Sequence, residues 1–213
     1  MILLTGFEPF DGETTNPSWL AARRAAEQLV AAGSPAVAVE IPCVFDLSRT
    51  VLQEALERYR PGIVLCVGQA GGRERISLER VAINVDDARI PDNAGNRPVD
   101  RPIVEGGPAA YFSTLPIKAC RGAVASSGVP VEVSQTAGTY VCNHLFYGLM
   151  SLLAEREDGC RGGFVHVPYS TEQARGNDAP GLALEQMADA LVLIATTTSG
   201  TTVDHRVAAG AEH

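Results

Sequence analysis

The sequence has few residues that could neutralise a polyanion. Its 213 residues include 17 Lys and Arg against 25 Asp and Glu, which gives a formal net charge of −8. The basic residues form no extended run, so the chain lacks the cationic stripe that a phosphate backbone or an anionic lipid surface requires. We therefore expect neither a nucleic acid nor a membrane as a partner.

Long apolar segments and paired cysteines are also missing. No run of about 18 apolar residues occurs, and the first predicted strand begins at Ile2, which leaves no room for the basic and apolar regions of a secretory leader. The five cysteines are odd in number, widely spaced and free of any Cys-x-x-Cys pair, which argues against a disulfide framework or a zinc cage. Because free thiols are typical of a reducing compartment, we expect a cytoplasmic protein.

Hydrophobic residues make up 46% of the chain, so a single domain over residues 1–213 could bury about 70% of its unfolded surface. Short apolar runs alternate with helical patterns along this domain. Strands are predicted over residues 2–5, 36–41, 63–67, 129–133 and 163–167, and helices over residues 17–32, 47–59, 117–126 and 182–196 and after Cys142. This alternation predicts an α/β fold, in which helices cover a sheet that is buried on both faces.

Two segments depart from this alternation. Residues 76–85 read as one longer strand, and residues 90–108 are rich in proline and glycine, so we expect a long ordered loop or flap there. The end of the chain, from Thr196 and especially over residues 200–213, is polar and rich in small residues. We expect this end to be a frayed tail without a functional role.

Cys142 is the strongest candidate for a reactive group. It stands directly ahead of a strongly patterned helix that includes Leu145, where unpaired backbone N–H groups and the helix dipole favour an anion. This placement predicts a thiol with a lowered pKa that exists largely as a thiolate, and therefore a nucleophile. The alternative is a buried core cysteine, because Cys142 shares the apolar helix face of Leu145.

His166 is the best candidate for a base that could serve this thiol. It lies near the end of a predicted strand, and functional side chains gather at the carboxyl ends of strands in open α/β sheets. His144 is two residues past Cys142, roughly 200° around the helix, and should point elsewhere. His205 and His213 lie in the polar tail. The alternative for His166 is a hydrogen-bonded core histidine.

Glu79 supplies a carboxylate on a mainly apolar strand face, which it shares with Val81 and Ile83. A carboxylate in that position is costly to bury and needs a specific partner, for which an imidazolium would serve. The competing explanation is an ion pair with Arg80 or Arg73. A thiol, an imidazole and a carboxylate together would form a triad in which the acid orients the base that takes the proton of the thiol.

Six segments in the same order resemble the pyroglutamyl peptidase I family. They are Thr5-Gly-Phe-Glu-Pro-Phe10 with Asn16-Pro17, Gly68-Gln-Ala-Gly-Gly-Arg73, Glu79-Arg-Val-Ala-Ile-Asn84, Ala88-Arg-Ile-Pro-Asp-Asn93, Ala137-Gly-Thr-Tyr-Val-Cys-Asn143 and His166-Val-Pro-Tyr169. The likeness extends from about Ile2 to Glu172. It implies a cysteine peptidase that removes N-terminal pyroglutamyl residues from peptides, on a three-layer α/β/α fold with a mixed, mainly parallel sheet, usually as a homotetramer.

The same resemblance implies a role for each matching residue. Cys142 looks like the nucleophile, His166 like its base and Glu79 like the acid that orients the histidine. By the same resemblance, the apolar lining of the lactam pocket would consist of Phe7, Phe10, Ile90 and Val141. Asn16, through its side chain, and Gln69, through its backbone carbonyl, look like the groups that read the lactam. Arg89 lies beside the family's active site as a possible oxyanion helper.

Gly68 to Arg73 lacks the spacing of a dinucleotide fingerprint or a P-loop, so we expect no cofactor and no metal. Asp11 stands where many members of the family have glycine, and its charge could alter the loop beside Phe10. Two other functions remain open from the sequence: a glutamine-type thiol amidase with the same triad, or a catalytically silent small-molecule binding protein on the same scaffold.

Overall fold

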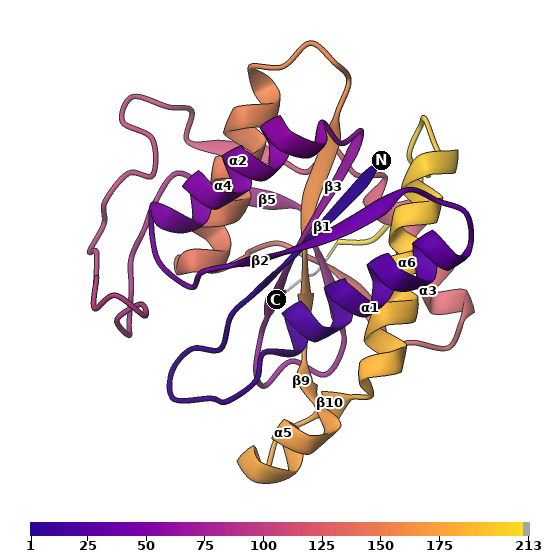
Figure 1. Cartoon of the computed structure of the whole chain (residues 1–213), viewed down its shortest axis with the longest axis horizontal. Helices are drawn as coiled ribbons and strands as arrows, with labels where there is room; N and C mark the ends of the chain where they lie inside the picture. The colour runs from indigo at the N-terminus through magenta and orange to yellow at the C-terminus, as the bar shows by residue number, and fades with distance from the viewer. Residues whose placement is uncertain (211–213) are drawn as a thin grey trace.

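The computed structural model describes residues 1–210 and is built around one six-stranded sheet (Figure 1). The strands lie in the order β2-β1-β3-β8-β4-β7. Their bounds are β1 Ile2–Phe7, β2 Ala36–Ile41, β3 Ile63–Gln69, β4 Ile76–Glu79, β7 Val131–Ser134 and β8 Arg161–Val167. Neighbouring strands are parallel except for β4 and β8, which run antiparallel. The predicted mixed, mainly parallel sheet is therefore confirmed.

Five helices cover the two faces of this sheet and complete the α/β/α arrangement. Their bounds are α1 Pro17–Ala31, α2 Leu47–Tyr59, α3 Ile117–Ser126, α4 Val141–Ala154 and α6 Leu184–Gly200. Helices α1, α3 and α6 pack together on one face, and α2 and α4 pack together on the other (Figure 1). Across the described part of the chain, no helix combines the length and the apolar character needed to cross a membrane.

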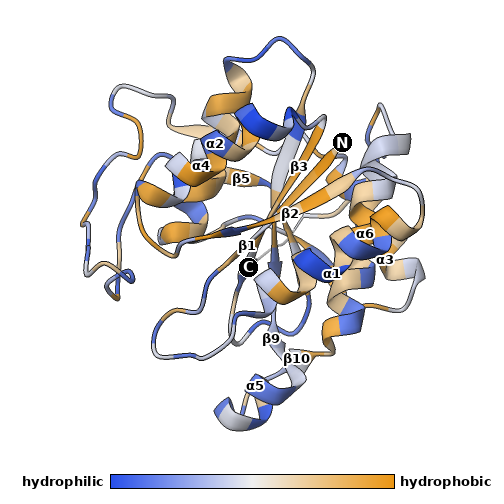
Figure 2. Ribbon diagram, in the orientation of Figure 1, coloured by the Kyte–Doolittle hydropathy of each residue, from blue (hydrophilic) through white to orange (hydrophobic). Residues whose placement is uncertain are grey.

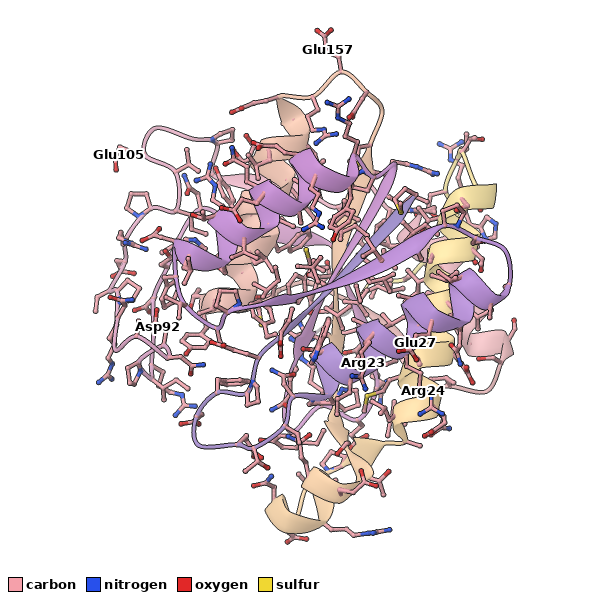
Figure 3. All side chains as sticks on the ribbon, viewed as in Figure 1. Arg23, Arg24, Glu27, Asp92, Glu105 and Glu157 are labelled. Carbon is pink, nitrogen blue, oxygen red and sulfur yellow. The ribbon has the colours of Figure 1, made fainter. Side chains whose placement is uncertain are left out.

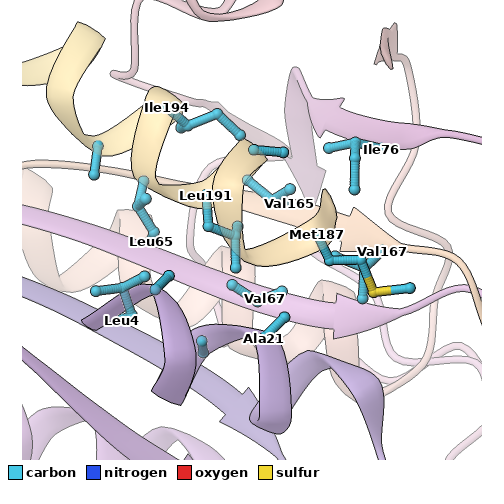
Figure 4. Close-up of a cluster of buried hydrophobic side chains, with 14 of the residues drawn as sticks. Leu4, Ala21, Leu65, Val67, Ile76, Val165, Val167, Met187, Leu191 and Ile194 are labelled. Carbon is cyan, nitrogen blue, oxygen red and sulfur yellow. The ribbon is translucent and has the colours of Figure 1, made fainter. Parts of the chain in front are cut away.

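The strands are apolar on both faces, as helices on both sides of the sheet require (Figure 2). Successive side chains alternate between the faces, so Leu4 and Leu65 pack with Leu191 and Ile194 of α6 (Figure 4). Leu3 and Phe164 point the other way and pack under α4. Residues of β3, β4 and β8 that share the face of Phe164 therefore lie beneath the start of α4.

The predicted single strand over residues 76–85 is wrong. The main sheet keeps β4 only as far as Glu79, and β5 (Val81–Ile83) leaves it to pair antiparallel with β6 (Ala110–Phe112). Asn143 of α4 causes part of this change, because its amide accepts a hydrogen bond from Ile83 N and donates to the carbonyls of Ile83 and Val85. The segment after Glu79 is thus bound to the helix that carries Cys142.

The long loop between β5 and β6 is held in place by hydrogen bonds of polar side chains rather than by strand pairing. Asn84 accepts hydrogen bonds from Ile103 N and Val104 N across the base of the loop. Asp92, labelled on the loop in Figure 3, accepts from Phe45 N and from Ala94 N near its tip. The expected ordered loop over residues 90–108 is confirmed.

One small unit at the carboxyl edge of the sheet was not expected from the sequence. Strands β9 (Tyr169–Ser170) and β10 (Gly181–Leu182) flank α5 (Thr171–Asn177). Ser170 and Gln173 form a capping box, in which the Ser170 hydroxyl accepts from Gln173 N and the Gln173 side chain accepts from Ser170 N. The spacing of Ser170 and Gln173 is the sequence pattern of a capping box and could have predicted this helix start.

The expected frayed tail is wrong over the residues that the structure describes. Helix α6 continues to Gly200, and residues 201–210 form neither helix nor strand but are tied to the body of the protein. Asp204 accepts hydrogen bonds from Lys118 N and Ala119 N, which lack partners within the first turn of α3. The carbonyl of Ala209 accepts from Arg80. Residues 211–213, including His213, lie outside the described residues.

We expect Asp204→Ala to lower the free energy of unfolding by about 1 kcal/mol, because it removes the cap from two backbone N–H groups of α3. This corresponds to roughly 2–4 °C in the midpoint of thermal unfolding for a chain of this size. Glu157→Ala, at an exposed turn (Figure 3), serves as the matched control. Equal unfolding midpoints for the two variants would contradict a capping role for Asp204.

Candidate active site

The carboxyl ends of β3 and β8, the end of β4 and the start of α4 meet at one place under the edge of the sheet. Gly68 and Gln69 end β3, His166 and Val167 end β8, and Glu79 ends β4. Parallel strands such as β3 and β8 present their carboxyl ends at the same edge, which is where such folds build their sites, whereas β4 is antiparallel to β8 and places Glu79 opposite Phe164, beside this edge. The residues that the sequence singled out as a nucleophile, a base and an acid all come from these elements.

His166 and Glu79 are joined by a short, fully buried hydrogen bond. His166 Nδ1 lies 2.7 Å from Glu79 Oε1, and the side chain of Glu79 has no exposed surface. Burial alone would raise the pKa of Glu79, but the hydrogen bond from His166 and the charges of His166 and Arg73 hold this pKa below its ordinary value. An ionised carboxylate only accepts, so Nδ1 donates and Nε2 of the imidazole is left as the basic nitrogen.

Cys142 is the second residue of α4 and its sulfur lies over Gly68. A Cβ added to Gly68 would lie 2.8 Å from Cys142 Sγ, so glycine leaves the room that the sulfur occupies. Gly68 is the register partner of His166 across β3 and β8, and paired residues of adjacent strands lie about 4.8 Å apart. The structure therefore brings the sulfur over the strand position next to His166.

The expected lowered pKa of Cys142 is wrong for the unliganded protein. Burial raises the pKa of this thiol well above its ordinary range, and electrostatic coupling to Cys43 and to Glu79 acts in the same direction, whereas the charge of Arg73 opposes it. A helix N-terminus contributes only about 0.3–1 kcal/mol, whereas full burial can move a pKa by several units. Desolvation therefore dominates, and the resting sulfur is a thiol.

His144 lies apart from the sulfur, as its position on the helix predicted. Its Nδ1 is 3.0 Å from Asp86 Oδ2, and its Nε2 accepts a hydrogen bond from Asp46 N at 3.1 Å. Arg101, which is 44% exposed, also pairs with the buried Asp86. His144 thus fastens the long loop to the start of α2, and His166 is the histidine at the strand position beside Cys142 Sγ.

Aromatic side chains lie around the start of α4. Phe7 is 2% exposed and packs 6.5 Å from the Phe164 ring, whereas Phe10 is half-buried and lies 6.2 Å from Tyr140. Tyr140, which was not among the predicted site residues, also packs edge-on against Phe45 and donates a hydrogen bond to the carbonyl of Pro91. Its place two residues before Cys142, inside a segment that resembles the family, could have indicated from the sequence that it lies near the site.

The two residues expected to read a lactam are held rigidly. Asn16 caps α1, because its Oδ1 accepts from the backbone and the hydroxyl of Ser18, and its Nδ2 donates to Glu8 O. Gln69 is buried at the end of β3, and its side-chain oxygen accepts from Gln173 of α5 at 3.3 Å. The backbone of both residues is therefore fixed at the carboxyl edge of the sheet.

The remaining predicted site residues differ in their exposure. Val141 is fully buried at the start of α4, Ile90 is half-buried in the long loop, and Arg89 is exposed. The loop that carries Ile90 and Arg89 is clamped to the segment containing Phe10, since Asn93 donates to Glu8 Oε1 at 2.8 Å and to Pro9 O at 2.9 Å. Both sides of the site are thus tied to each other.

All five cysteines are free thiols in this structure. Within residues 1–210, no group of three or more His, Cys, Asp or Glu side chains is arranged to hold a metal ion. The arrangement at Cys142 instead suits nucleophilic chemistry, in which a histidine oriented by a carboxylate removes the proton of the thiol.

Three comparisons with known proteins agree with one another. The family model for pyroglutamyl peptidase matches residues 1–200. The chain is 52% identical to a pyrrolidone-carboxylate peptidase of Klebsiella pneumoniae over 100% of its own length and 99% of that protein. The crystal structure of pyroglutamyl peptidase I from Bacillus amyloliquefaciens superposes with a TM-score of 0.92 at 48% identity, covering 97% of this chain and 98% of that one. A mutant pyrrolidone carboxyl peptidase from P. furiosus gives a TM-score of 0.88 at 37% identity, over 95% and 99% of the two chains.

We expect the alkylation of Cys142 by iodoacetamide to accelerate roughly tenfold per pH unit between pH 6 and pH 9, because a raised pKa keeps the reactive thiolate scarce throughout this range. Peptide mapping by mass spectrometry at each pH gives the rate for each cysteine. Cys160, whose pKa burial raises to about 11, is the internal reference. A rate at Cys142 that is already constant below pH 7 would show a preformed thiolate and contradict the dominance of burial.

Proposed function

The chain belongs to the pyroglutamyl peptidase family of cysteine-type peptidases, and we propose that its Cys142, His166 and Glu79 carry out the removal of N-terminal pyroglutamyl residues from peptides. The observation that supports these roles best is the buried 2.7 Å bond between Glu79 and His166, next to the strand position that the Cys142 sulfur covers. A core histidine without a catalytic role would not need an acid partner and a neighbouring thiol together.

The proposed reaction begins with a neutral thiol. His166 Nε2 takes the proton of Cys142 as Sγ attacks the pyroglutamyl carbonyl carbon, which gives a tetrahedral oxyanion and an imidazolium paired with Glu79. The intermediate collapses when His166 returns that proton to the departing amine, leaving a thioester on Cys142. A water molecule, deprotonated by His166, then attacks the thioester and releases pyroglutamate. The proton moves only while substrate is bound, which fits a thiol whose resting pKa is raised.

Backbone N–H groups at the start of α4 suit the oxyanion. The first four N–H groups of a helix have no intrahelical acceptor, and those of Val141 and Cys142 belong to this set. Removal of one such donor typically raises a barrier by about 2.7–4 kcal/mol. We place Arg89 at the outer side of this site as a helper, since it lies in the loop that is clamped beside Phe10.

The proposed pocket suits a neutral ring. Phe7, Phe10, Ile90 and Val141 supply apolar surface that can cover a lactam without burying a charge, whereas a free N-terminal ammonium would lose its hydration there without a counter-ion.

Two polar groups, the side chain of Asn16 and the backbone carbonyl of Gln69, are proposed to form hydrogen bonds with the lactam. One Nδ2 hydrogen of Asn16 holds Glu8 O, and its other hydrogen is assigned to the lactam carbonyl. The backbone carbonyl of Gln69 is assigned to the lactam N–H. Proline lacks the lactam carbonyl, and sites built around such a bond reject analogues of this kind by up to roughly 10⁴-fold.

The proposal also covers the cellular compartment, the partners and the assembly of the enzyme. Five free thiols suit a reducing compartment, so we place the protein in the cytoplasm with pyroglutamyl peptides as its partners rather than nucleic acid or a membrane. A homotetramer is the proposed assembly, since the family resemblance implies it.

A panel of four amide substrates tests the specificity directly. We expect release of a fluorescent amine from the pyroglutamyl derivative, and at least 10³-fold lower kcat/KM with the prolyl, glutaminyl and leucyl derivatives, on the order that a lost buried hydrogen bond gives. Cys142→Ser should retain the fold and lose nearly all of this activity. Preference for the glutaminyl derivative would indicate a different amidase, and no turnover of any derivative would indicate a binding protein.

Substitutions of the other two triad residues should differ in degree. His166→Ala removes the base, whereas Glu79→Gln leaves a base that is only misoriented, so we expect Glu79→Gln to retain the larger residual kcat. Steady-state kinetics of both variants on the pyroglutamyl substrate give the ratio. Wild-type activity in Glu79→Gln would assign the third role to another residue.

A further inference from the structure

The Glu79 carboxylate has a second partner besides His166. Arg73 Nη1 lies 2.7 Å from Glu79 Oε1, the same oxygen that His166 Nδ1 approaches to 2.7 Å. The other oxygen, Oε2, is buried and has no hydrogen-bond partner among the described residues. One carboxylate oxygen therefore contacts both a guanidinium and an imidazole, which from the sequence alone are alternative partners of Glu79.

The turn after β3 aims Arg73 at this position. Arg73 follows Gly72, whose φ of +87° favours glycine, and its Nη2 also donates to Thr136 O at 3.1 Å. Its side chain is 28% exposed, whereas Glu79 is fully buried. The two neighbouring cations are engaged elsewhere: Arg80 with Gln135 and Ala209, and Arg75 with Glu132. Arg73 is thus the cation committed to Glu79.

We propose that Arg73 is a positioning residue of the reaction, which keeps the buried Glu79 ionised and limits how strongly Glu79 stabilises the His166 imidazolium. This inference rests on the proposed triad. It gives a role to Arg73, a fourth residue that belongs neither to the proposed triad nor to the proposed substrate pocket.

The first half of this role follows from burial. A buried carboxylate loses its hydration, and its charged form needs compensation. A guanidinium stays charged whether or not the imidazole holds an extra proton, so Arg73 supplies the permanent positive charge on Glu79 Oε1 among the described residues. Arg73 therefore preserves an ionised acceptor that fixes the imidazole with Nε2 toward the thiol.

The second half concerns the imidazolium that forms during the reaction. Once His166 holds the proton, two cations share one carboxylate oxygen, and their repulsion makes the imidazolium a better acid. His166 must return that proton to the leaving amine, so an over-stabilised imidazolium would slow this step. Besides His166, Glu79 and Cys142 themselves, the charged or titratable groups coupled to this centre are Arg73, Cys43, Cys66 and Tyr140.

Arg73→Met tests the inference, because it keeps the aliphatic length and removes the charge. We expect kcat to fall roughly tenfold or more with KM little changed, and the acid limb of the kcat/KM profile to move up by about one pH unit, since loss of a cation favours the protonated imidazole. Arg73→Lys keeps a charge and should retain the wild-type acid limb. Arg75→Met, on the same turn and 47% exposed, is the matched control and should match wild type.

A double-mutant cycle keeps the test decisive if Arg73→Met unfolds. In a Glu79→Gln background the carboxylate is gone, so the charge-removing variant Arg73→Gln should no longer alter kcat, whereas it should lower kcat in the wild-type background. An unshifted acid limb in a folded Arg73→Met variant, or equal effects of Arg73→Gln in both backgrounds, would overturn the role of Arg73. If Glu79→Gln and His166→Ala themselves kept full activity, the triad would fail instead, so the two failures are distinguishable.

Discussion

The buried hydrogen bond between His166 and Glu79 is the interaction on which the rest of the site depends. It crosses from β8 to β4, the one antiparallel pair of the main sheet, and runs diagonally, because the register places Ser77 opposite His166 and Phe164 opposite Glu79. Both side chains lie on the face that α4 covers, so the bond points the imidazole at the start of that helix. A sheet with β4 reversed in direction would carry the same residues in a different order and lose this contact.

Burial has two opposite consequences at this site. Burial raises the pKa of Cys142, so the nucleophile rests as a thiol. Burial also disfavours the carboxylate form of Glu79, but Glu79 stays ionised because a guanidinium and an imidazole both contact it. The ionised acid then fixes which imidazole nitrogen is free to act as a base. In the proposed reaction the thiol therefore loses its proton only as it attacks a bound substrate carbonyl, whose oxygen takes up the negative charge.

The sequence predicted which residues come together better than it predicted their local geometry. Motif resemblance and strand position singled out Cys142, His166 and Glu79, and the chain offers only five cysteines and four histidines for the first two roles. The break after Glu79 was missed, because period-two alternation continues through residues 76–85 and cannot reveal that Asn143 binds the backbone of Ile83. The pKa of Cys142 was misjudged for a related reason: helix position is visible in a sequence, whereas the depth of burial depends on the packing of distant strands. The tether at Asp204 likewise depends on a contact with α3 that is 85 residues away in the chain.

The tautomer of His166 in the resting enzyme tests the central claim most directly. Nitrogen-15 NMR of histidine-labelled protein distinguishes a protonated Nδ1 from a protonated Nε2. An ionised Glu79 within 2.7 Å requires the proton on Nδ1, with a strongly hydrogen-bonded resonance that disappears in Glu79→Gln. A resting imidazole protonated on Nε2, with no change on substitution of Glu79, would contradict the account.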